Sequence, residues 1–132
     1  MAFSAHEEYI KSLSPEIQAL MLSIQEKVET LLPEAMRCIS YQIPAFRANQ
    51  HVFFYFAAFR QHIGIYPPVT KDLALINVLQ PYRGKKGNLS FPLDQPLPLE
   101  LIGQVAMALY LEYEAGTRRD ELDLYLSHKS NH

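Results

Sequence analysis

Apolar positions recur with helical spacing at the start of the chain, and turn-forming residues divide them into two helices. The first is short, and Ser4 and Glu7 stand at capping-box spacing before it. Ser14 and Pro15 restart the chain, because serine is a favoured cap and proline suits the first helical position. The second helix should end before Pro33, since a residue that precedes proline disfavours helix. Its predicted apolar positions are Ile17, Leu20, Met21, Ile24, Val28 and Leu31.

From residue 39 the apolar period changes to two, which predicts three strands at residues 39–43, 52–59 and 63–66. The first is an edge or interrupted strand, because Pro44 removes a backbone donor. Residues 52–59 are apolar on both faces, so we expect a central strand covered on both sides. In the third strand, Gly64 indicates a bulge or a close approach by a neighbouring side chain.

The second half of the chain predicts a short helix capped by Thr70, a last strand at residues 89–91 and a long final helix. Gly116 is expected to break the final helix. Residues 117–126 then form an added short helix, and residues 127–132 fray. The predicted apolar positions of the final helix are Leu101, Ile102, Val105, Leu109 and Tyr113.

This order of elements predicts an α+β fold, with a small, mainly antiparallel sheet packed by N- and C-terminal helices. It is not the pattern of a doubly wound sheet, which alternates strands with crossover helices and has a glycine-rich turn. We expect one domain over residues 1–114 and a C-terminal extension over residues 115–132.

Composition agrees with a single intracellular domain. The chain has 132 residues, of which 48% are hydrophobic and 20% are charged, enough to bury one core. No apolar run suits a membrane span or a signal peptide, so we expect a soluble, cytoplasmic protein without membrane partners. Cys38 is the only cysteine, which excludes an internal disulfide and a thiolate zinc site, and nothing near it in sequence activates it as a nucleophile.

Charge is distributed in three blocks. Residues 1–34 carry a net charge of −4, residues 35–93 carry +6, and residues 94–132 carry −4. The whole chain is mildly acidic and its aromatic residues fall in predicted core strands, so we expect no nucleic-acid partner.

Short motifs in a fixed order over residues 8–112 carry a family resemblance. They are Glu8-Tyr9-Ile10, Leu32-Pro33-Glu34-Ala35, Ile39-Ser40-Tyr41, Pro44-Ala45-Phe46, Tyr55-Phe56-Ala57-Ala58-Phe59, His62-Ile63-Gly64 and Phe91-Pro92-Leu93-Asp94. The chain resembles the DUF1801, or YdhG-like, family, which includes a frataxin-like bacterial iron chaperone. The resemblance implies a frataxin-like α+β fold and a role in delivering iron for iron–sulfur cluster or haem supply. The loop around Gly84 and Lys85 is more basic than in relatives, and residues 115–132 lie outside the resemblance.

Exposed carboxylates are the expected ligands if this implied role holds, because oxygen ligands suit iron without a dedicated cage. The candidate residues lie on the first two helices: Glu7, Glu8, Glu16, Glu26 and Glu29. Acids near a helix start are also favoured by the helix dipole alone, so the same residues have a purely structural explanation.

The basic middle of the chain predicts a different site. Cations of a glycine-flanked loop, with backbone donors at Gly87 and Asn88, could hold an anion beside aromatic strand residues. The candidate residues are Tyr41, Tyr55, His62, Tyr66, Arg83, Lys85 and Lys86. A solvated loop and a histidine bonded at a sheet edge are the simpler alternatives.

No catalytic constellation is present in the sequence, so we expect a binding or delivery protein and not an enzyme. Weak iron binding, with an iron–sulfur assembly protein as partner, is the leading hypothesis. A module for a small anionic ligand or an acidic protein is the alternative. A third hypothesis is a homodimer formed through residues 115–132.

Overall fold

The computed structural model describes the backbone of residues 3–130 and the side chains of residues 3–114. Within this part, the helices are α1 (His6–Lys11), α2 (Pro15–Leu31), α3 (Leu73–Val78), the 3₁₀ helix η1 (Gln80–Tyr82) and α4 (Leu99–Ser130). The strands are β1 (Met36–Ser40), β2 (Ile43–Ala48), β3 (His51–Ala58), β4 (His62–Tyr66) and β5 (Leu89–Pro92). Helices packed on one antiparallel sheet make an α+β fold, and the predicted fold class is confirmed.

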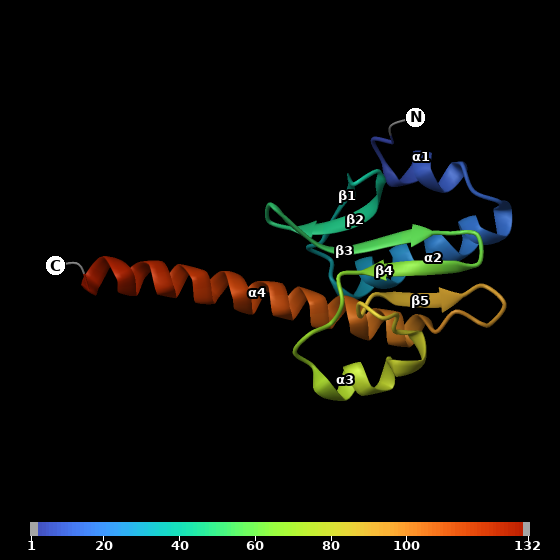
Figure 1. Cartoon of the computed structure of the whole chain (residues 1–132). Helices are drawn as coiled ribbons and strands as arrows, with labels where there is room; N and C mark the ends of the chain where they lie inside the picture. The colour runs from blue at the N-terminus through green and yellow to red at the C-terminus, as the bar shows by residue number, and fades with distance from the viewer. Residues whose placement is uncertain (1–2, 131–132) are drawn as a thin grey trace.

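The sheet is a five-stranded meander, in which each strand pairs with the next strand in sequence. All of these pairings are antiparallel. β3 lies at the centre, as its apolar sequence predicts, and β1 and β5 form the two edges (Figure 1). The connection from β4 to β5 contains α3 and η1, whereas the other strand connections are short turns.

The prediction of one strand at residues 39–43 is wrong, because two strands meet there. β1 ends at Ser40 and β2 begins at Ile43, and these two residues pair across a hairpin. Tyr41 and Gln42 form the turn, with φ angles of 52° and 64°. Two consecutive positive φ angles are typical of the type I′ turn, which favours Asn and Gly. Because Tyr and Gln are neither, the alternating sequence reads as one continuous strand.

α1 and α2 begin close to the predicted positions. Pro15 is the first residue of α2 and Ser14 precedes it as the N-cap, as predicted, although the serine side chain forms no capping hydrogen bond. The predicted capping box of α1 is wrong. Ala5 is the N-cap, and Ser4 donates a hydrogen bond to the Glu8 carboxylate instead.

Thr70 does not cap α3, contrary to the prediction. The N-cap is Asp72, whose carboxylate accepts a hydrogen bond of 3.0 Å from the Leu75 N–H. Thr70 instead donates from its N–H and its hydroxyl to the carboxylate of Glu112 in α4. These bonds attach the connection between β4 and α3 to the final helix.

α4 is one continuous helix, so the predicted break at Gly116 and the separate helix at residues 117–126 are wrong. A glycine inside a helix lowers stability by only about 1 kcal/mol relative to alanine, which neighbouring residues can outweigh. The helix also continues into residues 127–130, where fraying was predicted, and residues 131–132 lie outside the described part. In Figure 1 its red end projects beyond the sheet. No helix in the described part is long and apolar enough to cross a membrane.

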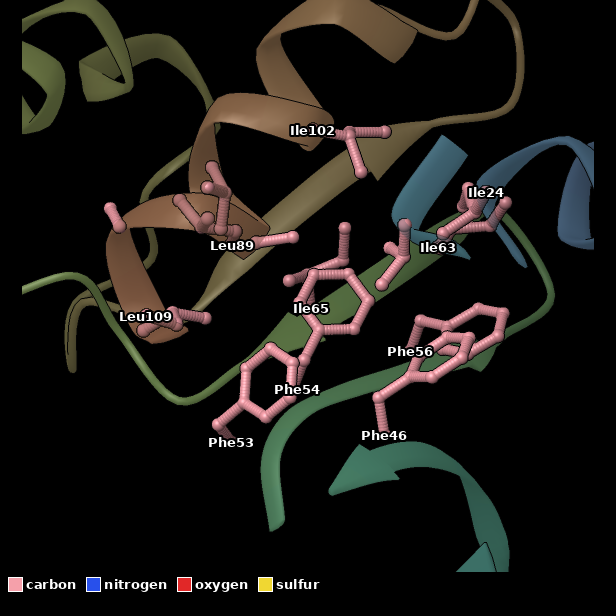
Figure 2. Packing of buried hydrophobic residues seen from close by; sticks show 14 of the residues in the cluster. Ile24, Phe46, Phe53, Phe54, Phe56, Ile63, Ile65, Leu89, Ile102 and Leu109 are labelled. Carbon is pink, nitrogen blue, oxygen red and sulfur yellow. The ribbon is translucent and has the colours of Figure 1, made fainter. Parts of the chain in front are cut away.

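The main core lies between the sheet and the helices α2 and α4 (Figure 2). β3 contributes Phe54 and Phe56, and β2 contributes Phe46; all three are fully buried. The rings of Phe46 and Phe56 stack with centroids 5.9 Å apart. α2 and α4 bury Ile24 and Ile102 in the same cluster. Since burying one such side chain contributes about 1.5–3 kcal/mol, this cluster anchors both long helices to the sheet.

One buried histidine attaches α1 to the rest of the fold. His6 is 2% exposed, and its Nε2 lies 2.8 Å from the Ala45 carbonyl oxygen and 3.0 Å from that of Cys38. Because carbonyl oxygens only accept, Nε2 carries the hydrogen. Nδ1 lies 2.9 Å from the side-chain amide oxygen, Oε1, of Gln25 in α2. His6 therefore joins α1, α2, β1 and β2.

Replacing His6 by alanine should lower the free energy of unfolding by about 2–4 kcal/mol, because buried polar groups lose their partner and a cavity forms. Urea unfolding followed by circular dichroism measures the change. Glu7→Ala is the control, since Glu7 is exposed on the same helix, and it should change stability by less than about 0.5 kcal/mol. An equal loss in both variants would contradict the role assigned to His6.

Candidate functional site

Strand register places a set of aromatic residues on the sheet face opposite the core. Tyr55 pairs with Ala45 on one side and with Tyr66 on the other. Directly paired residues of antiparallel strands point to the same face, and successive residues of a strand alternate between faces. Tyr55 and its partners therefore point away from Phe54 and Phe56, which lie in the core.

This second face carries no helix of the described part, because α2 and α4 lie behind the sheet in Figure 1. Side chains of the β-hairpins cover it instead. We name this set the aromatic layer; it consists of Tyr41, Tyr55, Phe59, His62 and Tyr66. The ring centroids of Tyr41 and Tyr55 lie 6.1 Å apart, and Phe59 stacks on His62 at 4.8 Å. Tyr41 is 86% exposed and Phe59 is 45% exposed, so the layer presents aromatic rings to solvent.

Small residues lie beneath the aromatic layer. Ala45 and Ala57 are buried, with 0% and 1% of their surface exposed, although no helix covers them. At Gly64, an added Cβ atom would lie 2.6 Å from the Tyr66 hydroxyl oxygen and 3.0 Å from a ring carbon of Phe59. Only glycine fits there without displacing Tyr66, which confirms the predicted close approach.

Residues 52–59 form a central strand that is covered on both sides, as predicted, but by two different kinds of cover. Helices cover one face, and the aromatic layer covers the other. Both faces are apolar because the helix-free face is built from small residues beneath aromatic rings. An apolar run predicts a central strand correctly, but it does not distinguish these two kinds of cover.

The predicted basic loop lies at one end of the aromatic layer. β5 begins at Leu89, which pairs with Ile65, the neighbour of Tyr66 in β4. Lys85 and Lys86 precede β5 and are exposed. The sheet thus brings the predicted lysines to the end of the layer where Tyr66 lies.

Other groups of this loop maintain its own conformation. The Gly87 N–H donates a hydrogen bond of 3.0 Å to the Gly84 carbonyl. Arg83 lies against the same turn, because an added Cβ at Gly87 would be 3.0 Å from its guanidinium. The Gly87 backbone donor that the sequence offered to an anion is therefore occupied, and Lys85 and Lys86 are the exposed cations of the loop.

Two residues of this face are absent from the predicted site. Phe59 lies four residues after Tyr55, and an even separation along a strand places two residues on the same face. This alternation could have predicted that Phe59 belongs to the aromatic face. Arg47 follows Ala45 by two positions in β2 and so lies on the same face.

Burial raises the pKa of the nearby Cys38 thiol, and the charge of Arg47 only partly offsets this. Cys38 is therefore mainly a neutral thiol at physiological pH.

The carboxylates predicted to bind iron are distributed over α1 and α2. Within the described residues, no group of three or more His, Cys, Asp or Glu side chains is placed to hold a metal ion. Glu8 accepts the hydrogen bond from Ser4, and Glu7, Glu16 and Glu26 are exposed. Iron binding by these separate carboxylates stays a prediction.

Glu29, the fifth of these acids, forms an ion pair. Arg37 in β1 donates from Nε to Glu29 Oε2 at 2.6 Å and from Nη2 to Oε1 at 2.9 Å. This hydrogen bonding by Arg37 holds the pKa of Glu29 below its ordinary value. The residue therefore has a structural partner, which links α2 to the edge strand.

Comparison with known proteins identifies a similar solved structure. A crystal structure of YdhG, a DUF1801 family protein from Bacillus subtilis, has a TM-score of 0.68 and 14% sequence identity, and the match covers 82% of this chain and 90% of that one. The two chains share one fold. No protein-family model and no curated protein matches this chain. At this identity the likeness concerns the fold alone, so the predicted YdhG-like architecture is confirmed while the frataxin-like relation stays a prediction.

Gly64→Ala should lower the free energy of unfolding by about 1–3 kcal/mol, because the new methyl group collides with the Tyr66 hydroxyl. In a Tyr66→Phe background, which lacks that oxygen, the same alanine should destabilise the fold less. Urea unfolding of all four proteins of this double-mutant cycle measures the coupling. Strictly additive effects would show that the two residues do not touch as described.

The Glu29 ion pair should make a small, pH-dependent contribution to stability. Because the pKa of Glu29 is lower in the folded state, the contribution is present above the unfolded-state pKa and is lost as the pH falls through the folded-state value. Glu29→Gln should thus be less stable than the natural chain at neutral pH, by less than about 1 kcal/mol because both groups are partly exposed. The difference should vanish in acid. Urea unfolding tests this, with Glu26→Gln as control; a difference that persists in acid would contradict it.

Proposed function

We propose that this protein is a non-catalytic binding protein whose aromatic layer docks an acidic protein partner. The observation that carries the proposal is an array of aromatic rings on a sheet face that no described helix covers. Aromatic residues are enriched in the buried centres of protein interfaces, because they bury much area at low entropic cost. An exposed ring such as that of Tyr41 has no role in the core and is available to a partner.

The shape of the aromatic layer favours a protein over a small ligand. Small-molecule sites are concave and enclose most of their ligand. None of five cavities in the described part of the chain, with volumes of about 260 to 540 Å³, is lined by a residue of the aromatic layer. A face that lines none of these five cavities suits the surface of a second protein better than a small ligand.

The cations around the aromatic layer favour an acidic partner. Arg47 lies on the same face, Arg60 follows Phe59 in the β3–β4 turn, and Lys85 and Lys86 lie at the Tyr66 end. Residues 35–93 have a net charge of +6. Complementary charge raises the rate of association and selects against basic surfaces.

Membership of the DUF1801 family is also inferred, from the ordered motifs together with the shared fold. A frataxin-like role in iron delivery stays a separate hypothesis, because it rests on the acids of α1 and α2 and not on the aromatic layer. Titration of ferrous ion into the chain and into a Glu7→Gln, Glu8→Gln, Glu16→Gln variant tests that hypothesis independently.

Peptide selection tests the docking proposal. A displayed library of random peptides is selected on the full chain, and the affinity of the recovered peptides is measured by fluorescence polarisation. Acidic peptides containing aromatic residues should be enriched. Tyr41→Ala should weaken their binding by at least about tenfold, since it removes an interface anchor without disturbing the core.

Leu73→Ala is the matched control, because Leu73 is 76% exposed on α3, away from the aromatic layer. It should leave peptide affinity unchanged. Lys85→Glu with Lys86→Glu should weaken binding and reduce its salt dependence. Recovery of no acidic peptides, or peptides that bind equally well to the Tyr41→Ala variant, would overturn the proposal.

A further inference from the structure

A second surface, on the helical side of the molecule, is an apolar groove between α2, α3 and α4. Its volume is about 500 Å³. The walls are formed mainly by Leu31 from α2, by Leu75 and Val78 from α3, and by Met107 and Leu111 from α4. Nothing in the aromatic layer contributes to it, so the groove is a separate surface with its own chemistry.

The groove gathers much of the exposed apolar surface of the described side chains. Of nine large hydrophobic residues that are exposed, four line it: Leu31, Val78, Met107 and Leu111. Val78 and Leu111 are each 57% exposed. Apolar residues clustered in this way mark an interaction surface more often than a solvated one.

The groove forms because α2 and α4 pack closely at one point while α3 lies farther from both. At Gly103 in α4, an added Cβ would lie 2.8 Å from Leu31 and 3.0 Å from Lys27, so α2 and α4 nearly touch there. Lys27 and Glu100 form an ion pair of 2.6 Å at this end. α3 lies beside α2 and α4 without filling the space between them, and its N-cap residue Asp72 also lines the groove.

α4 leaves the body of the protein just beyond the groove. The last groove residue on this helix is Leu111, and residues 115–130 continue past the sheet (Figure 1). At 1.5 Å per residue, this projecting part is about 24 Å long. Only its backbone is described, and the sequence supplies the pattern of its apolar positions.

The groove-lining stripe of α4 continues along the projecting part. At 3.6 residues per turn, positions 107, 111, 114, 118, 122 and 125 fall on one side of a helix, and positions 114 and 118 of this set hold Glu114 and Arg118. The last two positions hold Leu122 and Tyr125, whereas Leu124, Asp120 and Asp123 fall on other sides. An apolar groove and a helical stripe that ends in Leu122 and Tyr125 therefore occur on the same helix.

We propose that the groove is occupied by the projecting part of α4 from a second copy of this chain. The two α4 helices pair antiparallel around a two-fold axis between residues 114 and 115, so that each groove receives the partner's helix end. Met107 then lies opposite the partner's Leu122, and Gln104 lies opposite the partner's Tyr125. Ala115 and Gly116 lie directly after this axis in sequence, and small residues at a helix crossing allow the two helices to approach closely.

Charge complementarity agrees with this register. The same antiparallel alignment places Glu100, whose side chain is 88% exposed, opposite the partner's Lys129. It also brings the partner's Arg118 to Leu111, which lines a cavity together with two acids, Asp72 and Glu112, and one cation, Lys71. A self-complementary contact of this kind occurs twice in a two-fold dimer and closes without leaving a free end.

Sedimentation equilibrium of the full chain should give twice the mass of one chain. Leu122→Glu should raise the dimer dissociation constant by at least about a hundredfold, because a carboxylate then enters an apolar groove. Leu124→Glu makes the same change on another side of the helix and should leave the dimer intact. The thermal unfolding midpoint of concentrated Leu124→Glu should equal that of the natural chain, which separates loss of pairing from loss of folding.

Cross-linking tests the register itself. In a Cys38→Ser background, Met107→Cys combined with Leu122→Cys should give a disulfide-linked dimer under mild oxidation. The two positions are about 22 Å apart along one helix, too far for a disulfide within one chain. Met107→Cys with Leu124→Cys is the control and should cross-link far less. A monomer at all concentrations, a dimer unaffected by Leu122→Glu, or equal cross-linking in both pairs would overturn the proposal.

Discussion

Helices bury only one face of this five-stranded meander, and the rest of the structure depends on that constraint. His6, Ile24 and Ile102 all enter the core from the same side. Short turns join the strands from β1 to β4, and the longer connection from β4 to β5 places α3 beside α2 and α4, on the helical side. The second face must therefore be covered by its own side chains. Small residues beneath aromatic rings achieve this cover, and the outer surfaces of the rings stay in contact with solvent. The candidate binding surface is thus a direct result of the topology.

The helical layer also leaves an apolar surface exposed, in the space between α2, α3 and α4. α2 and α4 approach closely at Gly103, and Thr70 holds the connection before α3 to α4 through Glu112. α3 has only six residues, and it is too short to fill the space beside two long helices. The result is a groove in which leucine and methionine side chains face water. The sheet and the helical layer each cover the core on their inner side and leave one apolar surface exposed on their outer side. Monomeric proteins rarely expose large apolar patches.

The sequence predicts the fold class, the central strand and the register of the helices, because hydrophobic periodicity records which residues are buried. It does not predict the hairpin at Tyr41, because that turn lacks the Asn and Gly that mark it in most proteins. It overstates Gly116, because a single glycine lowers helix stability by less than the surrounding helix formers raise it. Four of the predicted ligand residues, Tyr41, Tyr55, His62 and Tyr66, do share one face. Whether these side chains are exposed to solvent depends on which face of the sheet the helices cover. Periodicity within a strand does not predict that face.

The two exposed surfaces lie on opposite sides of the sheet, so occupation of one leaves the other accessible. A dimer paired through the groove keeps both aromatic layers free. By the two proposals, such a dimer would bind a partner that carries two acidic sites more tightly than a single layer would, because the second contact forms at a high effective concentration. Weak contacts at a charged surface would then suffice for stable binding, while each single contact would still dissociate rapidly. The proposed self-association on the helical side and the proposed docking on the aromatic side are therefore compatible, and together they would make the assembled protein bivalent.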